Sequence, residues 1–441
     1  MLKKTVILAA ILAALSVGAK EAYRWHESQQ YPNPYWTSKE RLAIESLWLD
    51  RLHSLPEDPS NQVADNTEAA EFGRLLFFDK RLSVNGEVAC ATCHDPEKYF
   101  TDGKTLATGI GVTSRNSPSI VASAYQPFIF WDGRADSQWA QALGPLESDV
   151  EHGGSRMQYV HLIANDPVYR KRYHALFSAI PDLTDTDRFP ARAGPGSRDT
   201  DTEITAAWQA MREQDKKLVS QIYANIGKVI AAYERLMMPA PSRFDHYVQS
   251  LKDNSSQRLN ILSRDEVAGL RLFIGKARCI ECHNGPLFSN DSFANIGTPT
   301  PKGKVYDFGR SRGALEVVKS EFNCNSEYSD AQMHECSELR FIKLVGDDLI
   351  GAFKVPGLRN TSKTAPYMHA GQLKDLDDVM DHYNNPPITP FGHNMLTKLE
   401  LEPHQLKQII AFLHTLDSRI DVENHWLTSP ENDQYDLATN R

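Results

Sequence analysis

Two copies of a short cysteine motif constrain this chain more than any other feature of its sequence. The first copy, CATCH, fills residues 90–94, and the second, CIECH, fills residues 279–283. A structural zinc site needs four ligands, whereas each copy offers three with no partner pair nearby. A redox dithiol of the thioredoxin type needs a strand–helix–strand setting, which the surrounding sequence does not predict. Covalent haem uses every residue of the motif, because the two thiols bond the porphyrin and the histidine ligates the iron.

Each motif therefore predicts one covalently attached haem c. Two haems alone would make an electron carrier, because catalysis also needs an iron with an open position and a group that moves protons. The predicted attachment and proximal residues are Cys90, Cys93 and His94 for the first haem, and Cys279, Cys282 and His283 for the second.

The N-terminal residues predict export. Lys3 and Lys4 precede an apolar run over residues 5–17, and small residues at 17–19 follow it, as at the cleavage site of a secretory signal peptide. An uncleaved anchor is the alternative. Both interpretations place the folded protein outside the cytoplasm, in the periplasm, and only the anchor would attach it to a membrane.

The remaining cysteines and the net charge fit that compartment. Cys324 and Cys336 lie in a polar, turn-rich stretch and are predicted to form a disulfide under oxidising conditions. The net charge is −9, so no basic surface dominates, and nucleic acid is not an expected partner.

The predicted fold is mostly α, with two cytochrome c-like haem domains, long loops and little β structure. The length of 441 residues favours two domains, and the alternation typical of strands is scarce. The predicted boundaries are a signal peptide or anchor at 1–19, an N-terminal lead at 20–60, a first haem domain at 61–255, a second haem domain at 256–420 and a C-terminal tail at 421–441.

Several individual helices are predicted. A capping box formed by Ser263 and Glu266 opens a helix that runs to Phe273, directly before the second motif. Residues 101–119 are predicted to form a loop, and residues 181–202 a surface insertion rich in Pro, Gly, Asp and Arg. The other predicted helices cover residues 39–52, 66–78, 203–238 and 402–416.

Ordered sequence blocks give a more specific indication. Residues 130–135 read FWDGRA, and residues 364–371 read TAPYMHAG. With these blocks the chain resembles the bacterial dihaem cytochrome c peroxidase family, which includes the MauG-type enzymes, over roughly residues 65–418. Further matching blocks are LFFDKRLS at 76–83, FTDG at 100–103, RNSP at 115–118, SRFD at 242–245 and PGLRN at 356–360.

The resemblance implies roles for residues near the first haem, which would be the peroxidatic one. It implies that Trp131 lies between the two haems and assists electron transfer to the second. It also implies that Glu151 and Gln141 line the peroxide side of the first haem and that Pro145 shapes that pocket. Independently, a carboxylate in an apolar pocket can take a proton from one peroxide oxygen and return it to the other.

A calcium site between the haems is also implied by the resemblance. Asn116, Thr364 and Pro366 match the family's calcium positions, the last two through their backbone carbonyls. Amide and carbonyl oxygens are ligands that suit this ion.

The loop after the first motif departs from one branch of the family. Peroxidases that need reductive activation carry a histidine there, whereas Ile110 stands near that position here. We therefore expect the first haem to be five-coordinate or water-bound. His152 follows Glu151, and it is expected to point to solvent, with tuning of the carboxylate as the alternative.

The second haem also departs from the usual pattern. The family's usual methionine ligand is replaced by Tyr383, as in MauG-type enzymes, and an anionic phenolate would change the properties of the iron. Met380, His382 and Met368 remain alternative ligands. The tryptophan through which MauG-type enzymes oxidise a protein substrate is Ala277 here, so electrons from such a substrate would enter by another residue.

These features together predict an exported dihaem oxidoreductase that uses hydrogen peroxide. Oxidising equivalents would reach the second haem through Trp131 and then a protein substrate or an electron-donor protein, either a cytochrome c or a cupredoxin. One alternative is a peroxidase that removes peroxide with electrons from such a donor. The other is a non-catalytic electron carrier with two saturated haems.

Overall fold

The computed structural model describes residues 35–196, 202–253 and 261–430. The predicted signal peptide or anchor lies outside the described residues. The fold is mostly helical, as predicted. One small antiparallel sheet pairs β1 (Phe293–Ala294) with β2 (Phe353–Lys354). Among the described residues, no helix combines the length and apolar character needed to cross a membrane.

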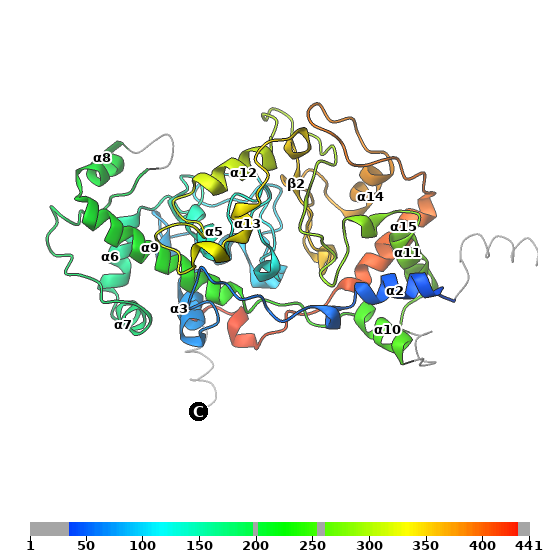
Figure 1. Cartoon of the computed structure of the whole chain (residues 1–441), viewed down its shortest axis with the longest axis horizontal. Helices are drawn as coiled ribbons and strands as arrows, with labels where there is room; N and C mark the ends of the chain where they lie inside the picture. Colours follow the sequence, from blue (N-terminus) through cyan, green and yellow to red (C-terminus); the bar gives the residue numbers. More distant parts are fainter. Residues whose placement is uncertain (1–34, 197–201, 254–260, 431–441) are drawn as a thin grey trace, which may run out of the picture.

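The helices form two groups around separate hydrophobic cores, one at each end of the molecule in Figure 1. The first group consists of α3 (Thr67–Phe77), α5 (Gln138–Glu147), α6 (Arg156–Asn165), α7 (Pro167–Leu176), α8 (Thr202–Ala210) and α9 (Glu213–Glu234). The second group consists of α2 (Ser38–Ser46), α10 (Arg243–Lys252), α11 (Arg264–Ile274), α14 (Leu376–Asn384) and α15 (Pro403–Leu413).

Each core is built on one closely packed pair of helices. In the first, α3 crosses α9 at Gly73, where an added Cβ would lie 1.9 Å from the Val229 carbonyl oxygen. In the second core, α11 crosses α15 at Gly269, where an added Cβ would lie 1.8 Å from the Gln408 carbonyl oxygen. Glycine is required at both positions because any side chain would force the backbones apart.

Both ends of the described chain cross between the two groups (Figure 1). Trp36 and Ile44, in and before α2, pack in the second core although they precede the first motif in sequence. At the other end, Ile420 packs in the first core, and the Tyr233 hydroxyl donates to the Trp426 carbonyl at 2.7 Å. The two cores are therefore tied together by chain segments as well as by the surface between them.

The insertion after β1 carries α12 (Arg310–Lys319) and α13 (Ser337–Arg340). Cys324 and Cys336 lie between and beside these helices and form a disulfide, with their Cα atoms 5.6 Å apart. The buried end of α12 packs on the residues around the FWDGRA block, because Arg310 Nη1 donates to the Gly133 carbonyl at 2.7 Å.

Several local predictions are confirmed. Residues 101–119 contain no helix or strand. Asn66 caps α3 by accepting from Ala69 N at 3.0 Å. The capping box at α11 is present, with Ser263 N donating to Glu266 at 2.7 Å and Glu266 N donating to Ser263 at 3.2 Å.

Three local predictions are wrong. The predicted helix over 203–238 is two helices, because Met211 turns into the first core and Asp215 at the start of α9 pairs with Arg188 at 2.6 Å. The segment 181–202 is not purely a surface insertion, since Phe189 is fully buried in the first core. The predicted helix at 39–52 ends at Ser46 and continues only as a short 3₁₀ turn at 49–51.

Candidate functional site

Both cysteine motifs open into one cavity of about 1060 Å³ between the two helix groups. Cys93 and His94 line it from the first motif, and Cys279, Cys282 and His283 line it from the second. None of the four motif cysteines is in a disulfide. Within the described ranges, no group of three or more His, Cys, Asp and Glu side chains is placed to hold a metal ion.

The two motifs adopt the same local turn. In each, the histidine N–H donates to the carbonyl of the first cysteine, at 2.9 Å for His94 and 2.8 Å for His283. The histidine Nδ1 then lies 3.1 Å from the carbonyl oxygen of a phenylalanine with positive φ, Phe100 in the first motif and Phe288 in the second. This contact places the ring proton on Nδ1 and leaves Nε2 as the free ligand atom.

These features fit a haem at each motif. Burial lowers the pKa of both His94 and His283, which keeps the rings neutral, as an iron ligand must be. His94 and His283 line this shared cavity together with Cys93, Cys279 and Cys282. The residues present therefore suit two covalently attached haem groups.

The residues expected on the peroxide side of the first haem meet on one wall of the cavity. Gln141 and Pro145 are one turn apart in α5, and Glu151 follows in the turn after that helix; all three line the cavity. The Glu151 backbone is fixed by its N–H to Ser148 O at 3.1 Å and by Ile110 N–H to its carbonyl at 3.0 Å. Burial raises the pKa of the Glu151 carboxyl, opposed in part by a hydrogen bond from Ser148.

His152 does not point to solvent, so that expectation is wrong. Its ring is only 3% exposed, and Nδ1 lies 3.1 Å from the Leu82 carbonyl oxygen. The backbone carbonyl of His152 accepts from Val84 N at 2.9 Å, so both its side chain and its backbone are fixed. Burial lowers its pKa to about 4.

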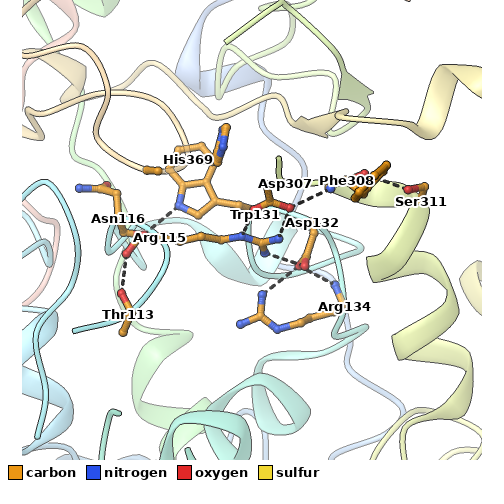
Figure 2. A network of polar contacts seen from close by, with 12 residues as sticks. Thr113, Arg115, Asn116, Trp131, Asp132, Arg134, Asp307, Phe308, Ser311 and His369 are labelled. Atoms are coloured by element: carbon orange, nitrogen blue, oxygen red, sulfur yellow. Dashed lines mark hydrogen bonds and ion pairs between the residues drawn. The ribbon is translucent and has the colours of Figure 1, made fainter. Parts of the chain in front are cut away.

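Trp131 lies in the cavity wall and is held by its side chain and its backbone. Figure 2 shows its indole N–H donating to the Asn116 carbonyl at 3.0 Å. Asn116 N–H in turn donates to the His369 carbonyl at 2.8 Å, and Lys354 N–H donates to the Trp131 carbonyl at 2.8 Å. Three segments distant in sequence therefore fix the orientation of this indole.

An ion-pair network surrounds Trp131 (Figure 2). Arg115 Nη1 lies 2.6 Å from Asp132 Oδ2, and Arg115 Nε and Nη2 donate to Asp307 at 2.8 and 2.9 Å. Arg134 pairs with the other Asp132 oxygen at 3.0 Å. The network joins the RNSP and FWDGRA blocks to the insertion that carries α12.

The residues implied for calcium also line the cavity. Asn116, Thr364 and Pro366 all contribute to its wall. The Asn116 amide Nδ2 donates to the Lys104 carbonyl at 2.7 Å, which leaves its Oδ1 available as a ligand.

The alternative ligands for the second haem separate into two groups. Tyr383, Met380 and Met368 line the cavity, whereas His382 Nε2 lies 2.8 Å from the Ile296 carbonyl oxygen and is engaged there. Burial raises the pKa of the Tyr383 phenol, with smaller contributions from the two cysteines of the second motif, so this side chain lies on that side of the cavity.

Two cavity residues were missed by the sequence analysis. Glu234 lies in the last turn of α9, and Lys354 lies in β2 with its amine directed at Gln126. The signal for Glu234 was present, because it falls on the same helical stripe as the apolar residues Ile230 and Met237. Lys354 carried no comparable signal.

Comparisons with known proteins give a consistent result. A family model described as di-haem cytochrome c peroxidase matches residues 67–253. The methylamine utilization protein MauG of Methylorubrum extorquens is 29% identical over 385 residues, which cover 86% of each protein. The cytochrome-c peroxidase IdrP1 of Denitromonas iodatirespirans is 30% identical over 82% of this chain and 85% of that protein.

A solved structure supports the same fold. A MauG-like protein associated with microbial copper homeostasis is 25% identical, with a TM-score of 0.57, over 86% of this chain and 99% of its own.

Proposed function

The chain belongs to the di-haem cytochrome c peroxidase family, and on that premise we propose that it is an exported MauG-like enzyme that reduces hydrogen peroxide at its first haem. The family's members are oxidoreductases with two haem c groups, which fits the two motifs on one cavity. Electrons would come through the second haem from a protein substrate or an electron-donor protein. Trp131, in the wall between the motifs, would assist this transfer.

The observation that carries the proposal is that Glu151 lines the cavity near the first motif, where its charge adds to burial in raising the pKa of both Cys90 and Cys93. A haem bound there supplies an iron that can bind and reduce peroxide. Reduction of one hydrogen peroxide to two waters consumes two electrons and two protons. The Glu151 carboxyl would take a proton from one peroxide oxygen and deliver it to the other, so that the second oxygen can leave as water.

The surroundings of Glu151 suit this role. Burial raises its proton affinity towards neutral pH, where a proton carrier works best. The Gln141 amide, on the neighbouring turn of α5, offers N–H donors and a carbonyl acceptor to orient peroxide. Pro145 places an apolar ring on the same wall.

The first experiment mixes the fully oxidised holoprotein with peroxide in a stopped-flow spectrometer. We expect a rapid spectral change without prior reduction, and a reaction slowed about 100-fold or more in Glu151→Gln. Asp149→Asn, which neutralises an exposed acid two residues earlier, is the control and should react at the wild-type rate. A Glu151→Gln variant that is as fast as the wild type would remove Glu151 from the mechanism, and a wild type that needs pre-reduction would contradict the MauG-like proposal.

We further propose that the Tyr383 oxygen is the second ligand of the second haem, opposite His283. Its place on the cavity wall supports this, as does the engagement of His382 with the Ile296 carbonyl. Tyr383→Phe should change the visible and electron paramagnetic resonance spectra of the second haem, whereas Met380→Leu should leave both unchanged. The reverse pattern would assign the ligand to Met380.

A second candidate function is removal of peroxide with electrons from a cytochrome c or a cupredoxin. The similarity to a protein named as a cytochrome-c peroxidase favours it. Steady-state oxidation of a reduced cytochrome c, dependent on peroxide and on Glu151, would support this function. Oxidation of a partner protein's side chains without such turnover would support the MauG-like one.

Export to the periplasm and a bound calcium ion complete the proposal. The disulfide between Cys324 and Cys336 supports an oxidising compartment, and cell fractionation with the full chain tests it. For calcium, Asn116→Ala removes the side-chain oxygen but keeps the carbonyl that accepts from Trp131. Metal analysis should find about one calcium in the wild type and less in this variant, and equal contents would contradict the assignment of Asn116.

A further inference from the structure

A buried acid in the cavity wall has no part in the proposed chemistry. Glu234, at the end of α9, is 6% exposed and lines the same cavity as Cys93 and His94. Within the described ranges, no hydrogen bond or ion pair reaches its carboxyl group. Burial of an unpaired carboxyl group is unfavourable, so its presence needs a physical reason.

The contrast with other buried acids is clear. Asp102 accepts from Lys104 N at 2.9 Å with Oδ1, although its Oδ2 is buried without a partner, and Asp215 accepts from Arg188 at 2.6 Å. Asp132 pairs with Arg115 and Arg134, and Asp245 pairs with Arg359 at 2.8 Å. Among the described acids that are buried to this degree, Glu234 is the one whose carboxyl group has no hydrogen bond or ion pair with the protein.

The charged groups around Glu234 do not supply that partner. On α3, Arg74 donates to the Thr428 carbonyl at 2.9 Å, and on α9 itself Arg235 pairs with Asp65 at 2.9 Å. The Tyr233 hydroxyl donates to Trp426. Elsewhere on α9 and on the helix α5 packed against it, Asp215 pairs with Arg188, Lys228 pairs with Asp330 at 2.8 Å, and Glu147 pairs with Arg156. Cys90 of the first motif and Tyr233 are titratable groups whose pKa is raised by burial and, to a smaller extent, by the Glu234 charge.

We infer that Glu234 is the proton-binding partner of the first haem, holding a proton when that haem is reduced and releasing it when the haem is oxidised. In the balanced step, a haem held at the first motif would take one electron from an electron-donor protein, or from the electrode in a titration, while the Glu234 carboxylate would take one proton from solvent and become a carboxylic acid. The coupling is electrostatic, because a carboxylate in a poorly screened cavity is stabilised by the extra positive charge of the oxidised iron.

The proton affinity of this group lies in a suitable range. Burial alone raises the pKa of Glu234 to about 8, so the carboxyl can change its protonation state near neutral pH when the charge of its surroundings changes. Since the charge of Glu234 also raises the pKa of Cys90, Glu234 lies on the side of the cavity where the first haem is attached. The inference rests on a haem at the first motif and not on the proposed peroxide chemistry.

The test is a spectroelectrochemical titration of the holoprotein between about pH 6 and pH 9. A tenfold change in proton concentration shifts a one-electron, one-proton potential by about 59 mV. We expect the potential of the first haem to fall with rising pH with up to this slope, and Glu234→Gln to flatten it. Glu97→Gln, an exposed glutamate beside the first motif, makes the same chemical change and should retain the wild-type slope.

A Glu234→Gln variant with the wild-type slope would overturn the inference. A second measurement begins with the wild type, so its first outcome does not depend on the folding of any variant. The infrared difference spectrum between reduced and oxidised holoprotein should gain a carboxylic-acid band on reduction, and Glu234→Asp should shift that band. Absence of the band in the wild type would also overturn the inference, whether or not the protein reacts with peroxide.

Discussion

Replacing Arg115 with methionine is expected to lower the free energy of unfolding by about 3 kcal/mol. The substitution removes the charge and keeps most of the aliphatic stem. Arg115 contacts two carboxylates, with Nη1 2.6 Å from Asp132 and Nε and Nη2 2.8 and 2.9 Å from Asp307. Its side chain is 17% exposed, and that of Asp132 is 5% exposed. Without Arg115, two partly or fully buried negative charges face each other across the network in Figure 2.

The magnitude follows from what each carboxylate retains. Loss of one partner of a buried ion pair costs about 3–5 kcal/mol. Asp132 keeps Arg134 at 3.0 Å, while Asp307 keeps the Gly309 N–H at 2.9 Å and its side chain is 26% exposed. These remaining contacts place the cost at the lower end of the range.

Arg81 provides a matched control. It also contacts two carboxylates, with Asp79 at 2.8 Å and Asp166 at 3.0 Å, but its side chain is 53% exposed. Because water screens these pairs, Arg81→Met should cost less than about 1 kcal/mol. The comparison therefore holds the number and length of the ion pairs nearly constant and varies the burial of the arginine, because the carboxylates are 9% and 18% exposed in one case and 5% and 26% in the other.

Denaturant unfolding of the holoprotein, followed by circular dichroism, measures both variants. The midpoints are compared after checking that the dependence on denaturant is unchanged, so that a shift reports stability. If Arg115→Met loses no more stability than Arg81→Met, burial does not set the strength of this network and the reasoning is refuted.

Two further predictions concern packing and pH. Gly269→Ala should destabilise the protein by about 1–3 kcal/mol because the new Cβ would lie 1.8 Å from the Gln408 carbonyl oxygen. Gly144→Ala, in the open part of another helix, should be neutral or stabilising by up to about 1 kcal/mol, and thermal unfolding compares the two. His152 and His369 both have a pKa lowered to about 4 by burial, so the unfolded chain binds protons that the folded protein does not. Stability should be fully present above about pH 7 and fall by about 2 kcal/mol per histidine between about pH 7 and pH 5, and an unfolding midpoint that does not change with acid would contradict this.

The haem motifs are features that could be predicted from the local sequence alone. All their ligand atoms lie within five consecutive residues, and the turn is closed by a hydrogen bond from His94 N to the Cys90 carbonyl. The capping box at Ser263 is equally local and equally well predicted. Such features depend on contacts between residues three or four positions apart, which the sequence displays directly.

Predictions failed where distant contacts override local preference. The helical periodicity over 203–238 is continuous, yet the chain breaks at Met211 because that side chain enters the first core. His152 looked like the polar neighbour of a pocket acid, yet the Leu82 carbonyl, seventy residues away in sequence, holds it buried. Nothing in the flanking residues encodes either contact.

By itself, the sequence determined that this chain carries two haem-attachment motifs in a mostly helical fold, and it identified Glu151, Gln141 and Trp131 through their resemblance to a family. Only the tertiary structure decided that these residues line the same cavity as Cys93 and His94 of the first motif, and that Glu234 is buried there without a protein partner. The physical reason is that covalent attachment is encoded by adjacent residues, whereas burial, and with it proton affinity, is a property of everything that packs around a group.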